Sequence, residues 1–162
     1  MSQDPVIVEL VRRVTNLEDD MMRQSARISV PVSSAFFSAY ATTTTALGAG
    51  VATTVALAGI VYTDGNFTSS TYVCPVDGNY LFAGAVNVTP PSSAKIASYI
   101  AQNGTAVFQG ATITTAAAAI LPVAGLLLCR AGDDITLLAY CSVAGGSVGS
   151  GGQYTYFAGQ IQ

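Results

Sequence analysis

The feature that most constrains this chain is a heptad repeat near its N-terminus. Seven positions between residues 7 and 28, spaced alternately three and four residues apart, form the repeat: Ile7, Leu10, Val14, Leu17, Met21, Gln24 and Ile28. A 3.5-residue period places these side chains along one seam of a helix, and an apolar seam is stable only against another helix. The repeat therefore predicts a coiled-coil stalk and an oligomer. The alternative is an amphipathic helix that packs on its own domain.

Two charged residues in the repeat indicate how many chains meet. Arg13, Val14, Leu17 and Glu18 form the pattern Arg-apolar-x-x-apolar-Glu, which resembles a short motif of trimeric coiled coils. In that motif the arginine reaches the glutamate of the neighbouring helix. We therefore predict one N-terminal coiled-coil α-helix that forms a homotrimeric stalk over residues 1–30, where a following proline ends it.

The remainder of the chain carries very little charge. Of fifteen charged residues, only six lie beyond residue 28: Asp64, Asp77, Lys95, Arg130, Asp133 and Asp134. Nucleic acids and anionic membrane surfaces both require clustered Lys and Arg, so neither is a predicted partner. Two apolar runs, residues 46–62 and 114–129, are shorter than a membrane span requires and predict pairs of buried strands. The charged helix leaves no place for a signal peptide in this sequence, so we expect none.

The residue types needed for common catalytic and metal sites are missing. Without histidine, neither a Ser-His-Asp triad nor a Cys-His dyad can form, so we predict that the protein is not an enzyme. Cys74, Cys129 and Cys141 lack metal-site spacing and are expected to be buried; a disulfide between two of them is the alternative. We expect no cofactor. Calcium at Asp133-Asp134 is a weaker alternative, because Ca²⁺ prefers six or more oxygen ligands.

Residues 31–162 read as one β domain. Short runs of β-branched and aromatic residues alternate with turn signals such as Asp77-Gly78 and Asn103-Gly104, a pattern typical of a sandwich or jelly roll. We predict about ten strands and no second helix. The predicted strands include residues 36–40, 51–61, 79–82, 86–88, 96–100, 107–108, 126–128, 135–140 and 154–161. The glycine-rich segment 144–152 is predicted to be a flexible loop.

One stretch of this domain resembles a known family. Residues 72–82 are similar to the pattern Phe-x-x-Pro-Val-x-Gly-x-Tyr-x-Phe of the complement component 1q globular-head family, and motifs before and after it agree in order and spacing. The resemblance implies a ten-stranded jelly roll, shared with the tumour-necrosis-factor superfamily, that trimerises through a sheet face. Residues 66–72 are about two residues shorter than in the family, with Ser70 where a glycine would stand. The matching positions are Phe37, Tyr72, Pro75, Gly78, Tyr80, Phe82, Gly132, Asp133, Phe157 and Gly159.

Two functional classes fit these observations. The first is a non-catalytic homotrimeric module for surface display, adhesion or structure, favoured as a virion spike, fibre or capsid-decoration protein on a particle surface. The second is a secreted, innate-immune-type recognition protein that binds glycan or protein ligands outside the cell. In both classes the partners are copies of the chain itself and a protein or glycan on a particle or cell surface. Strand-end loops, including residues 144–152, are the expected contact sites.

Overall fold

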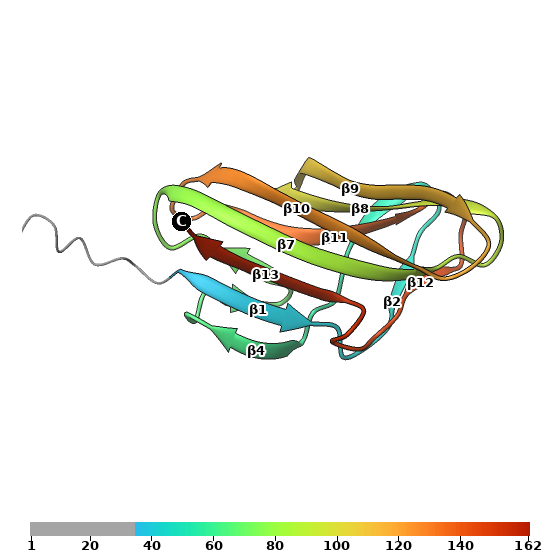
Figure 1. Ribbon diagram of the computed structural model, residues 1–162, viewed down its shortest axis with the longest axis horizontal. Helices are drawn as coiled ribbons and strands as arrows, with labels where there is room; N and C mark the ends of the chain where they lie inside the picture. Colours follow the sequence, from blue (N-terminus) through green and yellow to red (C-terminus); the bar gives the residue numbers. More distant parts are fainter. Residues whose placement is uncertain (1–34) are drawn as a thin grey trace, which may run out of the picture. The chain divides into compact units, whose positions relative to one another are not determined.

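The computed structural model describes residues 35–162, and the predicted stalk with its seam residues lies outside this range. The described residues form thirteen strands and no helix (Figure 1). The mainly β prediction is therefore confirmed for the head. Within residues 35–162 no helix is long and apolar enough to cross a membrane.

The strands form two antiparallel sheets that pack face to face. The larger sheet has seven strands in the order β2-β12-β7-β13-β1-β4, with β10 pairing with β7 as well, and the smaller has the order β5-β6-β11-β8-β9 (Figure 1). The seven-stranded sheet consists of β1 (Phe36–Tyr40), β2 (Thr45–Leu47), β4 (Gly59–Thr63), β7 (Gly78–Thr89), β10 (Ala119–Cys129), β12 (Gly146–Val148) and β13 (Tyr156–Ile161). The five-stranded sheet consists of β5 (Phe67–Thr68), β6 (Thr71–Val73), β8 (Ala94–Gln102), β9 (Thr105–Thr115) and β11 (Asp134–Cys141). Strand β3 (Val51–Thr54) belongs to neither sheet.

An aromatic cluster fills the space between the sheets. Its five members are fully buried: Phe37, Tyr72, Tyr80, Phe82 and Phe157. The ring centroids of Phe37 and Tyr72 lie 4.5 Å apart, and those of Phe82 and Phe157 lie 5.9 Å apart. Such ring contacts add to the gain from burying apolar area. Tyr80, Phe82 and Phe157, which are among the positions that carried the family resemblance, are therefore core residues.

Several predicted strand boundaries were wrong. Residues 79–82 and 86–88 were predicted as two strands, but both lie in β7, because β10 pairs with β7 continuously from Gly78 to Val88. The same pairing extends β10 over Ala119–Cys129, well beyond the predicted residues 126–128. The count of thirteen strands exceeds the predicted ten, since five strands of two to four residues are present.

The glycine-rich segment is more ordered than predicted. Residues Gly146–Val148 form β12, which pairs with β2 on one side and β7 on the other. Val148 is fully buried, and a Cβ on Gly146 would lie 2.9 Å from the Sγ atom of Cys141. The glycine therefore allows β12 to approach the core closely, and the prediction of a flexible loop is wrong for these three residues.

The two long apolar runs are not fully buried in the single chain. In β10, Leu121 and Val123 face the core and are buried, whereas Leu126 and Leu128 are 57% and 71% exposed. In β4, Val61 is 65% exposed. The prediction of buried strands is wrong for these positions, because within the described residues only the inner face of their sheet is covered by a second layer.

Candidate functional site: an apolar sheet face and a polar pocket

The outer face of the seven-stranded sheet is built from apolar side chains. Successive residues of a strand point to opposite faces, so the inward Tyr80 and Phe82 place Leu81 on the outside of β7. Leu81 lies opposite Leu126 of β10, and two residues further along, Ala83 lies opposite Ala124. Because register partners share a face, these pairs place apolar side chains side by side on β7 and β10, while on the β13 side Leu81 lies opposite the uncharged Gln160.

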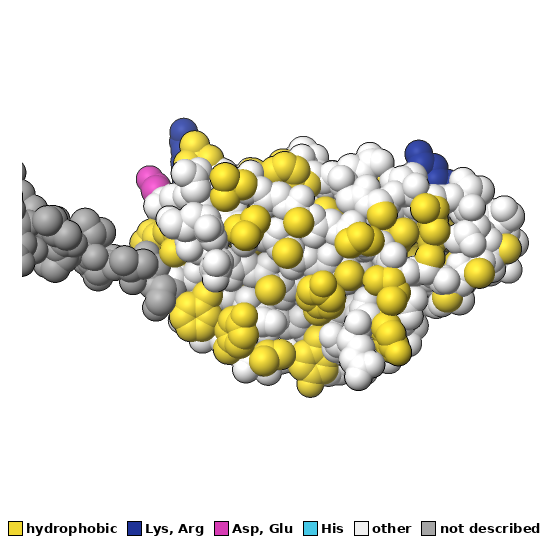
Figure 2. Space-filling model, in the orientation of Figure 1, with side chains coloured by type: hydrophobic (Ala, Val, Ile, Leu, Met, Phe, Trp, Pro, Cys, Tyr) yellow, Lys and Arg dark blue, Asp and Glu magenta, His cyan; other side chains and the backbone are white. Residues whose placement is uncertain are grey.

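We define the apolar face by six exposed apolar side chains on these strands, whose exposed fractions run from 40% to 71%: Tyr62, Leu81, Ile120, Leu126, Leu128 and Tyr156. None of the seven strands of this sheet contains Asp, Glu, Lys or Arg. Figure 2 shows hydrophobic side chains spread over this face, with the visible charges near its two ends.

Two hollows lie within this surface. One, of about 170 Å³, is bordered by Tyr62, Leu81 and Ala158, and the other, of about 420 Å³, by Tyr40, Val61 and Tyr156. Contiguous exposed apolar surface is uncommon on monomeric proteins and marks an interaction site. With no charge to desolvate, this face suits contact with another apolar surface.

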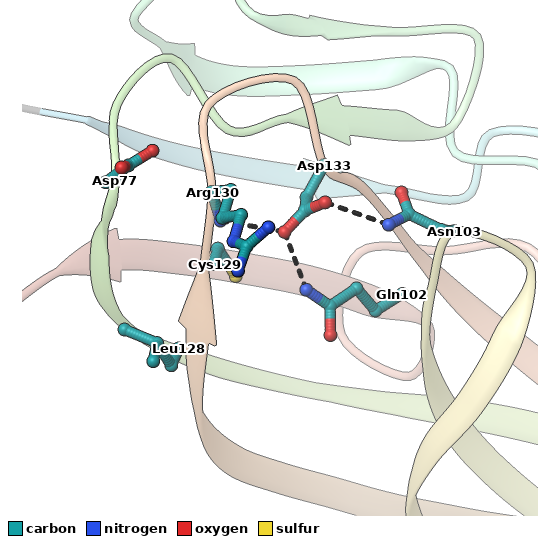
Figure 3. Close-up of a pocket in the computed structure, with 7 residues that line it drawn as sticks. All are labelled: Asp77, Gln102, Asn103, Leu128, Cys129, Arg130 and Asp133. Carbon is teal, nitrogen blue, oxygen red and sulfur yellow. Dashed lines mark hydrogen bonds between the residues drawn. The ribbon is translucent and has the colours of Figure 1, made fainter.

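A second feature is a polar pocket of about 560 Å³ where several strands end (Figure 3). It lies at the end of the sandwich that carries the C-terminus, where the backbone N–H of Gln162 donates to the Asn79 carbonyl (Figure 1). Its walls come from the residue before β7, the β8–β9 turn and the β10–β11 turn. The lining residues are Asp77, Gln102, Asn103, Leu128, Cys129, Arg130 and Asp133.

Asp133 holds the pocket together. Its carboxylate accepts hydrogen bonds from the backbone N–H of Arg130 at 2.7 Å, from Gln102 Nε2 at 2.7 Å and from Asn103 Nδ2 at 2.8 Å (Figure 3). The backbone N–H of Arg130, followed by the Asn103 amide, stabilises the charged form and lowers the pKa of Asp133. Asp133 therefore ties the β8–β9 turn to the β10–β11 turn.

Asp77 and Asn103 complete the set of loop contacts. Asp77 Oδ1 accepts a 2.8 Å hydrogen bond from the backbone N–H of Ala131, and Asn103 Oδ1 accepts one of 2.9 Å from the backbone N–H of Asp134. Asn103 has φ of 52° and Gly104 has φ of 78°, values of the hairpin turn that the Asn-Gly pair predicted. The β6–β7, β8–β9 and β10–β11 connections are thus joined into one rim around the pocket.

The described residues contain no group of three or more Cys, Asp or Glu side chains that could hold a metal ion. Both carboxylate oxygens of Asp133 are already hydrogen-bond acceptors. Three donors occupy most of the acceptor positions of this carboxylate, and one carboxylate alone cannot supply the six or more oxygen ligands that Ca²⁺ prefers. The arrangement can instead offer the Arg130 guanidinium and the Gln102 carbonyl oxygen to a polar ligand.

The residues that carried the family resemblance separate into two groups. Phe37, Tyr72, Tyr80, Phe82 and Phe157 lie in the core, where Gly159 lets the Phe82 ring approach: a Cβ there would lie within 2.4 Å of that ring. Gly78 begins β7, Pro75 precedes it in the β6–β7 connection, and Gly132 and Asp133 lie in the β10–β11 turn. The motif thus contributes to the core and to the pocket rim.

The family resemblance implied assembly through a sheet face, but sequence reasoning did not identify the residues of the apolar face, such as Leu81, Leu126 and Tyr156. A signal for it was present. A strand with one solvated face alternates apolar and polar residues, whereas residues 119–129 are apolar at almost every position. Such a run indicates that both faces of the strand are covered, the second one by another molecule if the chain itself supplies no layer.

Comparison with solved structures identifies the fold, whereas two sequence comparisons found no match. No protein-family model matches the sequence, and no curated protein matches it. Among solved structures, murine APRIL is similar at 15% sequence identity and a TM-score of 0.63, covering 80% of this chain and 99% of that chain. Eiger TNF from S. frugiperda is similar at 9% identity and a TM-score of 0.63, covering 80% and 92%.

The globular domain of zebrafish complement 1qA protein is similar at 12% identity and a TM-score of 0.54, covering 78% of this chain and 96% of that chain. These structures share the fold of the described residues, with TM-scores between 0.54 and 0.63. The head of this chain therefore has the jelly-roll fold of tumour-necrosis-factor-like proteins and of the complement component 1q globular domain, as the sequence motifs predicted.

Proposed function

We propose that the protein is a non-catalytic homotrimeric module for surface display, adhesion or structure, favoured as a virion spike, fibre or capsid-decoration protein. The observation that carries the proposal is the apolar face on the seven-stranded sheet. Side chains such as Leu126 and Leu128 are more than half exposed in the single chain, and copies of the chain packed on this face would remove them from water.

Further points support assembly into trimers. The sheet that bears the apolar face has no charged residue in its strands, so close approach of another copy meets no like-charge repulsion. The heptad repeat and its Arg13–Glu18 pattern favour three helices. Closed cyclic assemblies place the same surface of every copy in equivalent contacts. Fold likeness to tumour-necrosis-factor-like proteins agrees with this arrangement.

The alternative function is a secreted recognition protein that binds glycan or protein ligands. The polar pocket favours it, since Arg130 and Gln102 present a donor and an acceptor on a rim that Asp133 holds in place. Likeness to the globular domain of zebrafish complement 1qA also favours a recognition role. In this alternative the trimer remains, and the location changes from a particle surface to the extracellular space.

Substitutions on the two sheets test the assembly face. We expect Leu81→Asp, at a position 42% exposed on the apolar face, to dissociate the head, whereas Val107→Asp, 39% exposed on β9 of the other sheet, should leave assembly intact. Both should be made in a Leu17→Asp background, in which the predicted stalk cannot hold the chains together. Sedimentation velocity then measures the mass of each variant. Equal effects of the two head substitutions would contradict the proposed face.

The location of the native protein separates the two functional classes. If the protein is a particle component, it should co-sediment with purified particles and stay bound through a high-salt wash, because its head has few charges to screen. Recovery of all the native protein from particle-free fluid would contradict the favoured class and support the secreted alternative.

A further inference from the structure

Two of the three cysteines meet beneath the polar pocket. Cys74 lies just after β6, and Cys129 is the last residue of β10. The backbone N–H of Cys74 donates a 2.9 Å hydrogen bond to the Asp133 carbonyl, and the Gly132 N–H donates a 2.8 Å bond to the Cys74 carbonyl. These bonds hold Cys74 against the turn that begins immediately after Cys129.

The two side chains are also neighbours. Both residues are completely buried in the same core cluster, and each thiol influences the pKa of the other. The Cys129 S–H also lies 3.8 Å from the Leu127 carbonyl oxygen, to which it can donate. Because Cys74 is held against the turn that follows Cys129, the two buried thiols can form a disulfide with a small movement of the chain.

The third cysteine lies elsewhere in the fold. Cys141 ends β11, where it pairs with Ile96, while the other end of that strand, Asp134, borders the pocket turn. Its Sγ atom lies against Gly146 of β12. Cys141 therefore serves as a matched control: it is equally buried, has the same chemistry, and is not in contact with the pair.

We propose that Cys74 and Cys129 form a redox pair that closes into an intrachain disulfide when a small-molecule disulfide, such as oxidised glutathione, is the oxidant. One cysteine thiolate attacks the oxidant and releases its first thiol. The second cysteine thiolate then attacks the mixed disulfide and releases the other thiol. The two cysteines lose two protons and two electrons in total, and the oxidant is reduced to two thiols.

The disulfide would fasten the β6–β7 connection to the end of β10, and so fix two of the three connections that form the pocket rim. Its reaction rate follows from burial. Burial raises the pKa of both thiols, so little thiolate is present in the closed fold at neutral pH. The bond therefore forms during folding, or when the end of β10 opens, and the closed reduced protein reacts slowly.

The test uses the full chain, refolded with oxidised and reduced glutathione or with a reductant. After denaturation, alkylation should label all three cysteines of the reduced protein but only Cys141 of the oxidised protein. Peptide mapping should find Cys74 linked to Cys129. Cys141→Ala should retain the linkage, whereas Cys74→Ala should leave two free thiols. The oxidised protein should melt about 10 °C higher than the reduced protein.

Three results would overturn the proposal: labelling of all three cysteines after oxidative refolding, a linkage that includes Cys141, or equal melting temperatures of the linked and reduced proteins. If Cys74→Ala does not fold, Cys129→Ala provides the same count of free thiols. Because the linkage lies within one chain, the outcome is independent of the assembly state of the head.

Discussion

Phe82→Ala should be strongly destabilising, and its effect can be worked from the packing of the ring. Phe82 is fully buried, stacks on Tyr80 at 5.8 Å and on Phe157 at 5.9 Å, and meets Tyr72 edge-on at 6.4 Å. Removing a buried phenylalanine ring costs about 3–5 kcal/mol. Since these aromatic contacts add to area burial, we expect about 4–5 kcal/mol here.

Urea denaturation followed by circular dichroism measures this loss. With an m-value of about 2 kcal/mol/M, the midpoint should fall by about 2 M. Val107→Ala is the control, because Val107 is 39% exposed on β9, and it should cost less than about 1 kcal/mol. Both variants must be compared at one protein concentration, since assembly contributes to stability. A midpoint shift for Phe82→Ala no larger than that of the control would refute the assignment of Phe82 to the core.

Three further predictions concern other parts of the chain. Gly159→Ala should cost about 1–3 kcal/mol, because the new Cβ would lie within 2.4 Å of the Phe82 ring, whereas Gly48→Ala, with open space at its Cβ, should be nearly neutral in the same denaturation assay. Because its pKa is lowered in the fold, ionised Asp133 stabilises the protein at pH values above the unfolded-state pKa of this carboxyl. This stabilisation is lost as the pH falls through the folded-state pKa. Asp133→Asn should therefore reduce the melting temperature at pH 7 and have little effect at pH 2. Equal melting shifts at the two pH values would contradict that assignment. Leu17→Asp should place a charge in the predicted seam and cost several kcal/mol per trimer, yet leave the β-type circular dichroism of the head unchanged at room temperature.

Local patterns predicted the core of the head well. The spacing of Pro75, Gly78, Tyr80 and Phe82 matches a family pattern, so the aromatic cluster could be anticipated. The Asn103-Gly104 hairpin was also predictable, because the turn requires φ values that Asn and Gly tolerate.

Features that depend on distant pairing were not predictable. The length of β7 follows from continuous pairing with β10, which lies about 40 residues later in the chain. The order of Gly146–Val148 follows from pairing on both sides, which outweighs the conformational freedom of a glycine-rich segment. The pocket depends on Asp77 and Asp133, which are 54 and 31 residues from their respective partners Ala131 and Gln102.

The departure from the family pattern before Pro75 has a conformational consequence. Ser69 and Ser70 have φ of 49° and 69°, values that favour glycine, in the tight turn between β5 and β6. Ser70 offsets part of this cost, since its Oγ accepts a 2.7 Å hydrogen bond from the backbone N–H of Leu57. The shortened segment is thus held by a contact that its sequence alone did not indicate.

The central claim, that this chain acts as a homotrimer, is tested most directly by its mass in solution. Sedimentation equilibrium of the full chain at micromolar concentration should give three times the 16.5 kDa of one copy, about 50 kDa, and the same mass in low and in high salt, because apolar contacts are not screened. A stable monomer or dimer under these conditions would contradict the account.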